Sequence, residues 1–244
     1  MAFRRVGRVL VPQGSEQGSP PPRPGGITMV SPSPARSKAE PARWQSELAN
    51  VLDGFVIRRA GEPDYDRAGL ASCRRGLSKK PMTEPAMYQY IAPVSLSVPR
   101  HWGAQAQARV EAATHYTLAM YGFHQQSQDR RMHQTFSQHH GPSVGAAASR
   151  LHQALKSNTP EGVDRRFLAA MTADSVEEVV GHLRVLVPQL RQHAIPLDYI
   201  VLADDLFNWP DSQRRARARR RWGLDYRWVP SDEADKPDST QSHA

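Results

Sequence analysis

The chain has 244 residues, and 32 lysines and arginines against 24 aspartates and glutamates give it a formal net charge of +8. Its single cysteine, Cys73, excludes an intrachain disulfide and a zinc site built on paired cysteines. The apolar runs are too short to span a bilayer, and the apolar run before Pro12 is too short for a secretory signal. The composition therefore predicts a soluble cytoplasmic protein, with no membrane partner, whose basic surface attracts polyanions.

Both ends of the chain differ in composition from the middle. Residues 1–41 hold eight of the 20 prolines, five glycines and five serines, and carry a net charge of +4. Such a segment buries too little apolar surface to offset its ordering entropy, so we expect a disordered leader. It is either an arm that binds nucleic acid or an extension without a specific role. Residues 231–244 carry a net charge of −3 without an apolar cluster, which predicts a disordered acidic tail.

Helical periodicity begins after the leader. Trp44, Leu48 and Phe55 recur at three- and four-residue steps and predict a helix over 42–60. Weaker patterns predict helices over 64–77 and 84–91, followed by an extended link between Pro93 and Pro99. The Ala-rich stretch 101–126 predicts a long helix in which Gly122 is a weak point.

The second half of the core repeats this pattern after a polar, His-rich loop at 127–142. Apolar spacing predicts helices over 144–156, 197–209 and 211–228. Capping signals mark the start of two more: one begins at Thr159–Pro160, and the other runs from a capping box at Asp174–Glu177 to Leu190. Pro188 lies inside one of them and predicts a kink or an early stop. No segment alternates as a strand does. We therefore expect an all-α fold of eight or nine helices without a sheet. The core would span 42–230, as two packed subdomains over about 42–126 and 143–230.

No group of residues has the spacing that catalysis or metal binding requires. His124, His133, His139 and His140 are nine, six and one residues apart and lie mostly in the 127–142 segment, which we interpret as a solvated polar loop and not as a metal site. Asp204 and Asp205 are adjacent, so on a helix their side chains point about 100° apart and favour a structural or capping role. The common nucleophile, metalloprotease and nucleotide-binding motifs are not found in the sequence. We therefore expect no catalytic residue, no metal and no cofactor, and thus no enzyme.

Arginines concentrate near the C-terminal end. They occupy six of the eight positions from 214 to 221: Arg214, Arg215, Arg217, Arg219, Arg220 and Arg221. On a helical wheel Arg214, Arg217 and Arg221 share one stripe with Arg220 beside it, whereas Arg215 and Arg219 lie on the side of Trp222 and Tyr226. One side of this helix can therefore dock on the core while the other presents guanidinium groups outward.

Smaller basic pairs are distributed along the chain. They include Arg58–Arg59, Arg74–Arg75, Lys79–Lys80, Arg130–Arg131 and Arg165–Arg166. One interpretation is a surface that follows a phosphate backbone. The other is a solvated face that Asp204, Asp205, Asp211 and Asp225 balance.

Several segments together resemble the CasB family, the small, belly-forming subunit of the type I-E CRISPR surveillance complex called Cascade. Two N-terminal segments carry part of the resemblance, Ile57–Pro63 and Met87–Pro93. Six further segments follow in order: Ser143–Gly145, Asp164–Phe167, Asp174–Arg184, Ile195–Tyr199, Leu202–Trp209 and Arg221–Tyr226. The similarity extends over roughly 43–228, and the leader, the acidic tail and Pro188 depart from the family pattern.

The resemblance implies an all-helical, non-enzymatic protein that works inside a larger complex in antiviral defence. Its partners would be other Cascade subunits, the guide RNA, the target DNA including the displaced non-target strand, and a second copy of itself. By holding the guide–target region and the displaced strand it would stabilise the R-loop. The basic surface of the family corresponds to these residues: Arg58, Arg59, Arg100, Arg165, Arg166 and the basic positions Arg214, Arg217, Arg220 and Arg221, with Arg130 and Arg131 in a loop that is also basic in relatives.

Two other functions fit the same composition. A helical regulator with its arginine-rich helix in the major groove would bind one DNA duplex far better than random duplex. A helical scaffold for other proteins, whose charge only aids solubility, would bind neither single strands nor duplex. A Cascade subunit would bind single strands weakly and without sequence preference.

Overall fold

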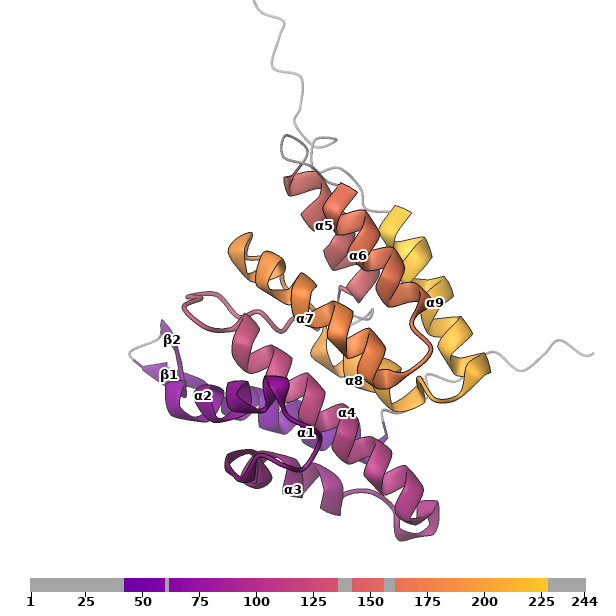
Figure 1. Cartoon of the computed structure of the whole chain (residues 1–244). Helices are drawn as coiled ribbons and strands as arrows, with labels where there is room; N and C mark the ends of the chain where they lie inside the picture. The colour runs from indigo at the N-terminus through magenta and orange to yellow at the C-terminus, as the bar shows by residue number, and fades with distance from the viewer. Residues whose placement is uncertain (1–41, 60–61, 136–141, 156–160, 228–244) are drawn as a thin grey trace, which may run out of the picture. The chain divides into compact units, whose positions relative to one another are not determined.

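A computed structural model describes residues 42–59, 62–135, 142–155 and 161–227 (Figure 1). The predicted leader 1–41 and tail 231–244 lie outside the described residues, as do the predicted helix start at 159–160 and positions 136–141 of the polar loop. Within the described ranges the α-helices are α1 (Arg43–Gly54), α2 (Arg67–Arg75), α3 (Tyr88–Leu96), α4 (Gly103–His124), α5 (Val144–Ala154), α6 (Glu161–Thr172), α7 (Val176–Gln192), α8 (Tyr199–Asn208) and α9 (Ser212–Arg227). Three short 3-10 helices are η1 (Gly76–Ser78), η2 (Pro85–Met87) and η3 (Arg100–Trp102). The all-α prediction is confirmed.

The first predicted helix is shorter than expected. α1 buries Trp44, Leu48 and Leu52 and ends at Gly54. The chain then forms a hairpin of β1 (Val56–Arg59) and β2 (Glu62–Tyr65), whose antiparallel register pairs Val56 with Tyr65. The prediction of helix to residue 60 is therefore wrong for these positions. Each strand has four residues, too few to show an alternating pattern, and this pair is the one sheet found in the described parts of the chain.

Helix α4 is the element around which the first half of the core packs. Its neighbours include α1, α2, α3, α7 and α8. Apolar and polar side chains along it are buried, among them Leu118, Met120, Thr114 and Thr117. Gly122, which sequence alone marks as a weak point, is a point of close approach between α4 and α2. A Cβ there would lie 2.7 Å from the carbonyl oxygen of Leu70, so the glycine permits this contact.

Two prolines lie inside helices. α7 continues through Pro188 to Gln192, so of the two expectations for this proline, a kink or an early stop, the early stop is wrong. α3 continues in the same way through Pro93, where an extended link was expected. Burial explains this tolerance, because α7 buries Leu186, Val187 and Leu190 on either side of its proline.

The second half packs on buried tryptophans. Trp209 and Trp222 are both buried, and their rings lie 5.2 Å apart between the end of α8 and α9. Helix α9 packs closely against α5, since a Cβ at Gly145 would lie 1.9 Å from the carbonyl oxygen of Trp222. The inner side of α9 is therefore fixed in place.

Helix α7 begins one residue later than the predicted capping box. Its cap is Ser175, whose side chain accepts from the backbone N–H of Glu178 at 3.1 Å. The Glu178 carboxylate in turn accepts from the backbone N–H of Asp174 at 2.9 Å. Both groups thereby satisfy donors at the helix start.

Candidate nucleic-acid interface

The outward side of α9 carries a row of exposed side chains. Gln213, Arg217, Arg220 and Leu224 follow one another at helical spacing, and all four are exposed. We call these four residues the outer face of α9. Among the described residues, neither Arg217 nor Arg220 forms an ion pair with a carboxylate. The outer face therefore presents guanidinium groups that are available to an anion.

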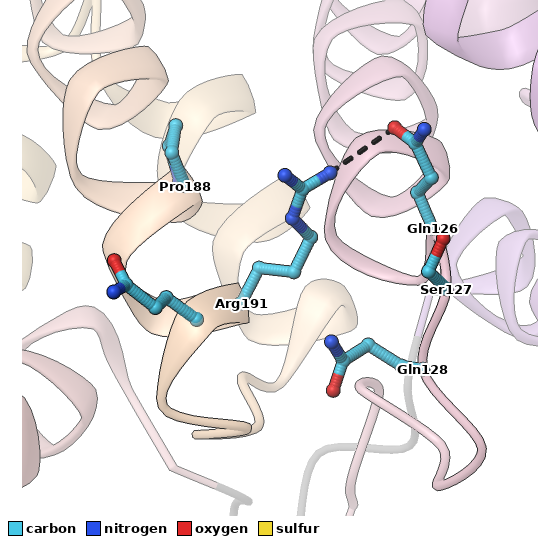
Figure 2. A pocket seen from close by; sticks show the side chains of 6 residues that line it. Gln126, Ser127, Gln128, Pro188 and Arg191 are labelled. Carbon is cyan, nitrogen blue, oxygen red and sulfur yellow. Dashed lines mark hydrogen bonds between the residues drawn. The ribbon is translucent and has the colours of Figure 1, made fainter.

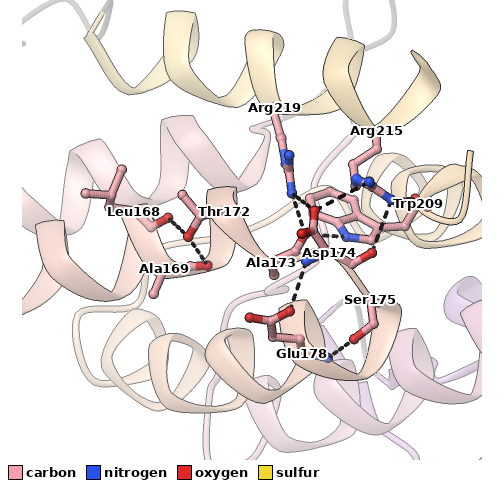
Figure 3. Close-up of polar contacts among 10 residues, drawn as sticks. All are labelled: Leu168, Ala169, Thr172, Ala173, Asp174, Ser175, Glu178, Trp209, Arg215 and Arg219. Carbon is pink, nitrogen blue, oxygen red and sulfur yellow. Dashed lines mark hydrogen bonds and ion pairs between the residues drawn. The ribbon is translucent and has the colours of Figure 1, made fainter. Parts of the chain in front are cut away.

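The inward arginines of α9 serve a structural purpose instead (Figure 3). Arg219 donates to the carbonyl oxygen of Ala173 at 2.6 Å and to the Asp174 carboxylate at 3.1 Å. Arg215 donates to the carbonyl oxygens of Asp174 and Trp209, each at 3.1 Å. The prediction that Arg215 and Arg219 lie on the core side is confirmed, and these bonds tie α9 to the turn between α6 and α7.

Arg221 was expected to face outward with Arg217, and the structure corrects this. Its guanidinium donates to both oxygens of Asp205, and Oδ2 of Asp205 also accepts from the indole N–H of Trp222 at 2.9 Å. The Asp205 side chain is 4% exposed. Burial raises the pKa of Asp205 to about 6, although the Arg221 guanidinium and the Trp222 N–H act in the opposite direction. Arg221 therefore neutralises a buried carboxylate, in the structural role expected for Asp205.

Arg214 and Arg100 flank the same end of α8. Arg214 is exposed and donates to the side chain of Asn208 at 2.6 Å. Arg100 is also exposed and lies in η3, where Trp102 stacks on Phe207 with ring centroids 6.0 Å apart. Because Phe207 and Asn208 are consecutive in α8, the structure brings these two predicted arginines to neighbouring parts of the surface.

Arg165 and Arg166 lie on the helix beside α9. Both are exposed on α6. Phe167 of this helix stacks on Tyr226 of α9 with centroids 4.5 Å apart, and Asp174, just after α6, meets Arg219. Residues later in the sequence of α6 therefore contact residues earlier in α9, so the two helices run antiparallel to each other. Their basic residues share one half of the fold.

The remaining predicted arginines lie at the opposite end of α4. Arg130 is exposed in the loop after this helix, and Arg131 forms an ion pair with Asp53. Arg58 and Arg59 belong to β1, whose partner strand reaches the same loop through a 3.5 Å bond from the Tyr65 hydroxyl to the carbonyl oxygen of Asp129. Since α4 has 22 residues, about 33 Å of helix separates these residues from Arg100.

Sequence reasoning missed one further arginine near this end. Arg191 of α7 lines a pocket of about 460 Å³ with Gln126, Ser127, Gln128, Pro188 and Gln192 (Figure 2). Its guanidinium donates to the Gln126 side chain at 3.1 Å and lies 4.5 Å from the ring centroid of Phe123. It therefore links α7 to the end of α4. A single arginine without basic neighbours gives no signal in the sequence.

The histidines differ from the solvated loop that was expected. His124 and His133 are buried around Tyr199, whose hydroxyl lies 2.9 Å from Nδ1 of His124 and whose backbone N–H donates to Nδ1 of His133 at 3.1 Å. Burial lowers the pKa of each to about 4, so both are neutral at pH 7. His139 and His140 lie outside the described residues. Across the described ranges, no three His, Cys, Asp or Glu side chains are grouped so as to hold a metal ion.

None of the helices that the structure describes is long and apolar enough to cross a membrane. The fold and the surface together define a class, a mainly helical protein with exposed arginines spread over several of its helices. Comparison with known proteins narrows this class. The family model of CRISPR-associated protein Cse2 matches residues 69–226, and the chain belongs to this family, which includes CasB.

Solved structures agree with the family assignment. The crystal structure of CasB from Thermobifida fusca matches with a TM-score of 0.57 and 28% sequence identity, over 75% of this chain and 94% of that one. CasB from Thermus thermophilus matches with a TM-score of 0.54 and 21% identity, over 75% and 97% of the two chains. A chain of a CRISPR RNA-guided surveillance complex has a TM-score of 0.54 and 23% identity, over 76% and 91%. No curated protein matches the chain.

Proposed function

We propose that this chain is a non-catalytic subunit of a CRISPR RNA-guided surveillance complex, in which its exposed arginines hold nucleic acid and stabilise the R-loop. Membership of the Cse2 family and the similarity to a chain of such a complex support the assembly. The proposed partners are other subunits of the complex, a second copy of this chain, the guide RNA, and the target DNA with its displaced strand.

One observation carries the nucleic-acid part of the proposal. The arginines of α9 divide into an inward set, which carboxylates and carbonyl oxygens engage, and an outward pair, Arg217 and Arg220, without an ion-pair partner among the described residues. Arg165 and Arg166 on α6, Arg214 on α9 and Arg100 in η3 add exposed charge in the same half of the fold.

Arginines that are spread over several elements are better suited to holding an extended single strand than to reading the bases of a duplex. Each contact to a phosphate is weak and independent of sequence, so a path of several contacts is needed. R-loop formation exchanges one duplex for another at nearly equal free energy, and modest contacts can therefore shift the balance. Arg58, Arg59 and Arg130, at the other end of α4, would extend this path. Arg221 is excluded from it because of its bond to Asp205.

The test begins with co-purification of the tagged chain, followed by R-loop lifetimes in the reconstituted complex. We expect Arg217→Ala/Arg220→Ala and Arg165→Ala/Arg166→Ala to incorporate normally and to shorten the lifetime. Lys79→Ala/Lys80→Ala, which removes two exposed charges elsewhere, is the matched control. If three or four phosphates are held, single-strand affinity should fall with a slope of roughly −2 to −3 in log salt.

Three results would contradict the proposal. Unchanged R-loop lifetimes in correctly assembled variants would reduce the arginines to a solvated face. Strong preference for one duplex sequence would favour a regulator. Absence of a guide RNA from the purified assembly, together with no binding to single strands or duplex, would favour a protein scaffold.

A further inference from the structure

The outer face of α9 has a specific order of chemical groups. Read from the C-terminal end of the helix, exposed Leu224 comes first, followed by Arg220 and Arg217. The Leu224 residue is 58% exposed. A ligand that fits this face needs an apolar group followed by at least two separated negative charges.

The chain itself contains a segment with that order. Residues 228–244 follow directly after α9 and lie outside the described residues. Their sequence begins with apolar Trp228 and Val229, continues with Asp232, Glu233, Asp235 and Asp238, and contains one lysine, which gives a net charge of −3. We propose that the acidic segment 228–244 docks back along the outer face of α9 and competes there with nucleic acid.

The segment is long enough to do this. Arg220 lies seven residues before Arg227, which is about 10 Å along the helix, and five extended residues from Arg227 to Asp232 span up to about 17 Å. Arg217 lies about 15 Å back along the helix, and the eight residues to Asp235 span up to roughly 27 Å. The order of the groups therefore matches when the segment runs antiparallel to α9, with slack to spare.

The described carboxylates near α9 are bonded to other groups, so the outer face of α9 can still receive the acidic segment. Asp174 and Asp205 are engaged by the inward arginines. Asp225 accepts from the hydroxyl of Ser143. Asp211 accepts from the backbone N–H groups of Gln213 and Arg214 at the start of the helix, where it also interacts with the charges of Arg214 and Arg217. Arg220 has no such neighbour among the described carboxylates.

A segment tethered to its own site has an effective concentration in the millimolar range, so weak and screened charge pairs suffice for partial occupancy. Docking would then raise the threshold for binding nucleic acid. Short or weakly held strands would be rejected, whereas a strand that contacts several arginine groups would displace the segment. This consequence for nucleic acid depends on the proposed function, whereas the docking itself does not.

Docking is measured without nucleic acid by a nitroxide label on Ser239→Cys in the full chain. Cys73 is fully buried and burial raises its thiol pKa to about 12, so the label reacts selectively with the new cysteine. We expect restricted label motion at about 50 mM salt and free motion at about 500 mM, since the contacts are electrostatic. Arg217→Gln/Arg220→Gln should free the label at low salt, whereas the control Lys79→Gln/Lys80→Gln should not. Equal label motion in the chain with native arginines and in the Arg217→Gln/Arg220→Gln variant would overturn the docking.

Competition is measured by binding of a dT20 oligonucleotide to the full chain with a neutral segment. That variant carries Asp232→Asn, Glu233→Gln, Asp235→Asn and Asp238→Asn and keeps the length. We expect about threefold to tenfold tighter binding at low salt, which a few exposed charge pairs can supply, and convergence at high salt. Equal affinities would overturn the competition. If the label is held and no variant binds dT20, the docking stands and the nucleic-acid function fails. If dT20 binds all variants equally and the label moves freely, the docking fails and the nucleic-acid function stands.

Discussion

Two arginines four residues apart on α9 should respond very differently to the same substitution. Arg221→Ala removes the cation that faces the buried carboxylate of Asp205, whereas Arg217→Ala removes an exposed charge without an ion pair in the described structure. The first should destabilise the fold and the second should not. The pair of variants therefore separates the structural arginines of this helix from those available to ligands.

The structure sets the size of the effect. Removing one partner of a buried ion pair costs about 3–5 kcal/mol. The Arg221 side chain is 37% exposed, so water already screens part of this interaction, and we expect about 2–3 kcal/mol at pH 8. Arg217→Ala should change the free energy of unfolding by less than about 0.5 kcal/mol.

The loss should also depend on pH. In the folded chain burial raises the pKa of Asp205 to about 6, above its unfolded value of about 3.9. Its protonated form is thus favoured by folding, and the associated stability is present at acid pH and lost as the pH rises through the folded pKa. Without Arg221 this pKa rises further. The Arg221→Ala penalty should therefore be smaller at pH 5 than at pH 8.

Urea unfolding of the full chain, followed by tryptophan fluorescence at both pH values, measures these differences. Comparing variants at the same pH cancels the titration of all other groups that the substitution leaves unaffected. A penalty for Arg221→Ala at pH 8 no larger than that for Arg217→Ala would refute the structural role of the pair. So would a penalty that grows toward acid pH.

Three further outcomes follow from burial. Burial lowers the pKa of His124 to about 4 against about 6.5 unfolded, so its stabilising effect is present above pH 6.5 and falls by about 2 kcal/mol at pH 5. His124→Gln should reduce the loss of unfolding free energy between pH 7 and 5 by that amount, and an unchanged pH dependence would contradict this. Gly145→Ala places a Cβ 1.9 Å from the Trp222 carbonyl oxygen and should lower the unfolding free energy by about 1–3 kcal/mol. Gly181→Ala is the control, because a Cβ there meets open space, and it should raise the unfolding free energy slightly. If the two variants shift Tm in the same direction, the close contact at Gly145 is contradicted. A thiol reagent at pH 8 should modify Cys73 only after denaturant is added, and labelling of the folded chain would show that the site opens.

Helical periodicity predicted the second half of the fold well. Apolar spacing and capping signals predicted the extent of α7 to within two residues, and spacing predicted the inward side of α9, because a helix that buries one stripe shows that stripe in its sequence. The β-hairpin was missed because its strands have four residues each and β2 contains Pro63. Pro93 and Pro188 misled the prediction because burial of flanking side chains outweighs the local preference of proline to end a helix.

The candidate site was predicted in outline but not in detail. A helical wheel separates Arg215 and Arg219 from Arg217, but it places Arg221 on the same outward stripe as Arg217, where the structure shows it bonded to Asp205. The carboxylate that engages Arg221 comes from α8, and the one that engages Arg215 comes from the turn after α6. Which arginines remain available is therefore a property of tertiary packing, and no local pattern contains it.

The position of α4 has a consequence for how the molecule comes apart. Helices from before it, α1 to α3, and from after it, α7 and α8, all use α4 as their packing partner. A cut in the chain after α4 would leave the C-terminal fragment without that partner, and the N-terminal fragment would expose the side of α4 that α7 and α8 cover. We expect neither fragment to fold alone, whereas the two mixed together should recover the native fold. Heat or denaturant should accordingly unfold residues 42–227 in one transition.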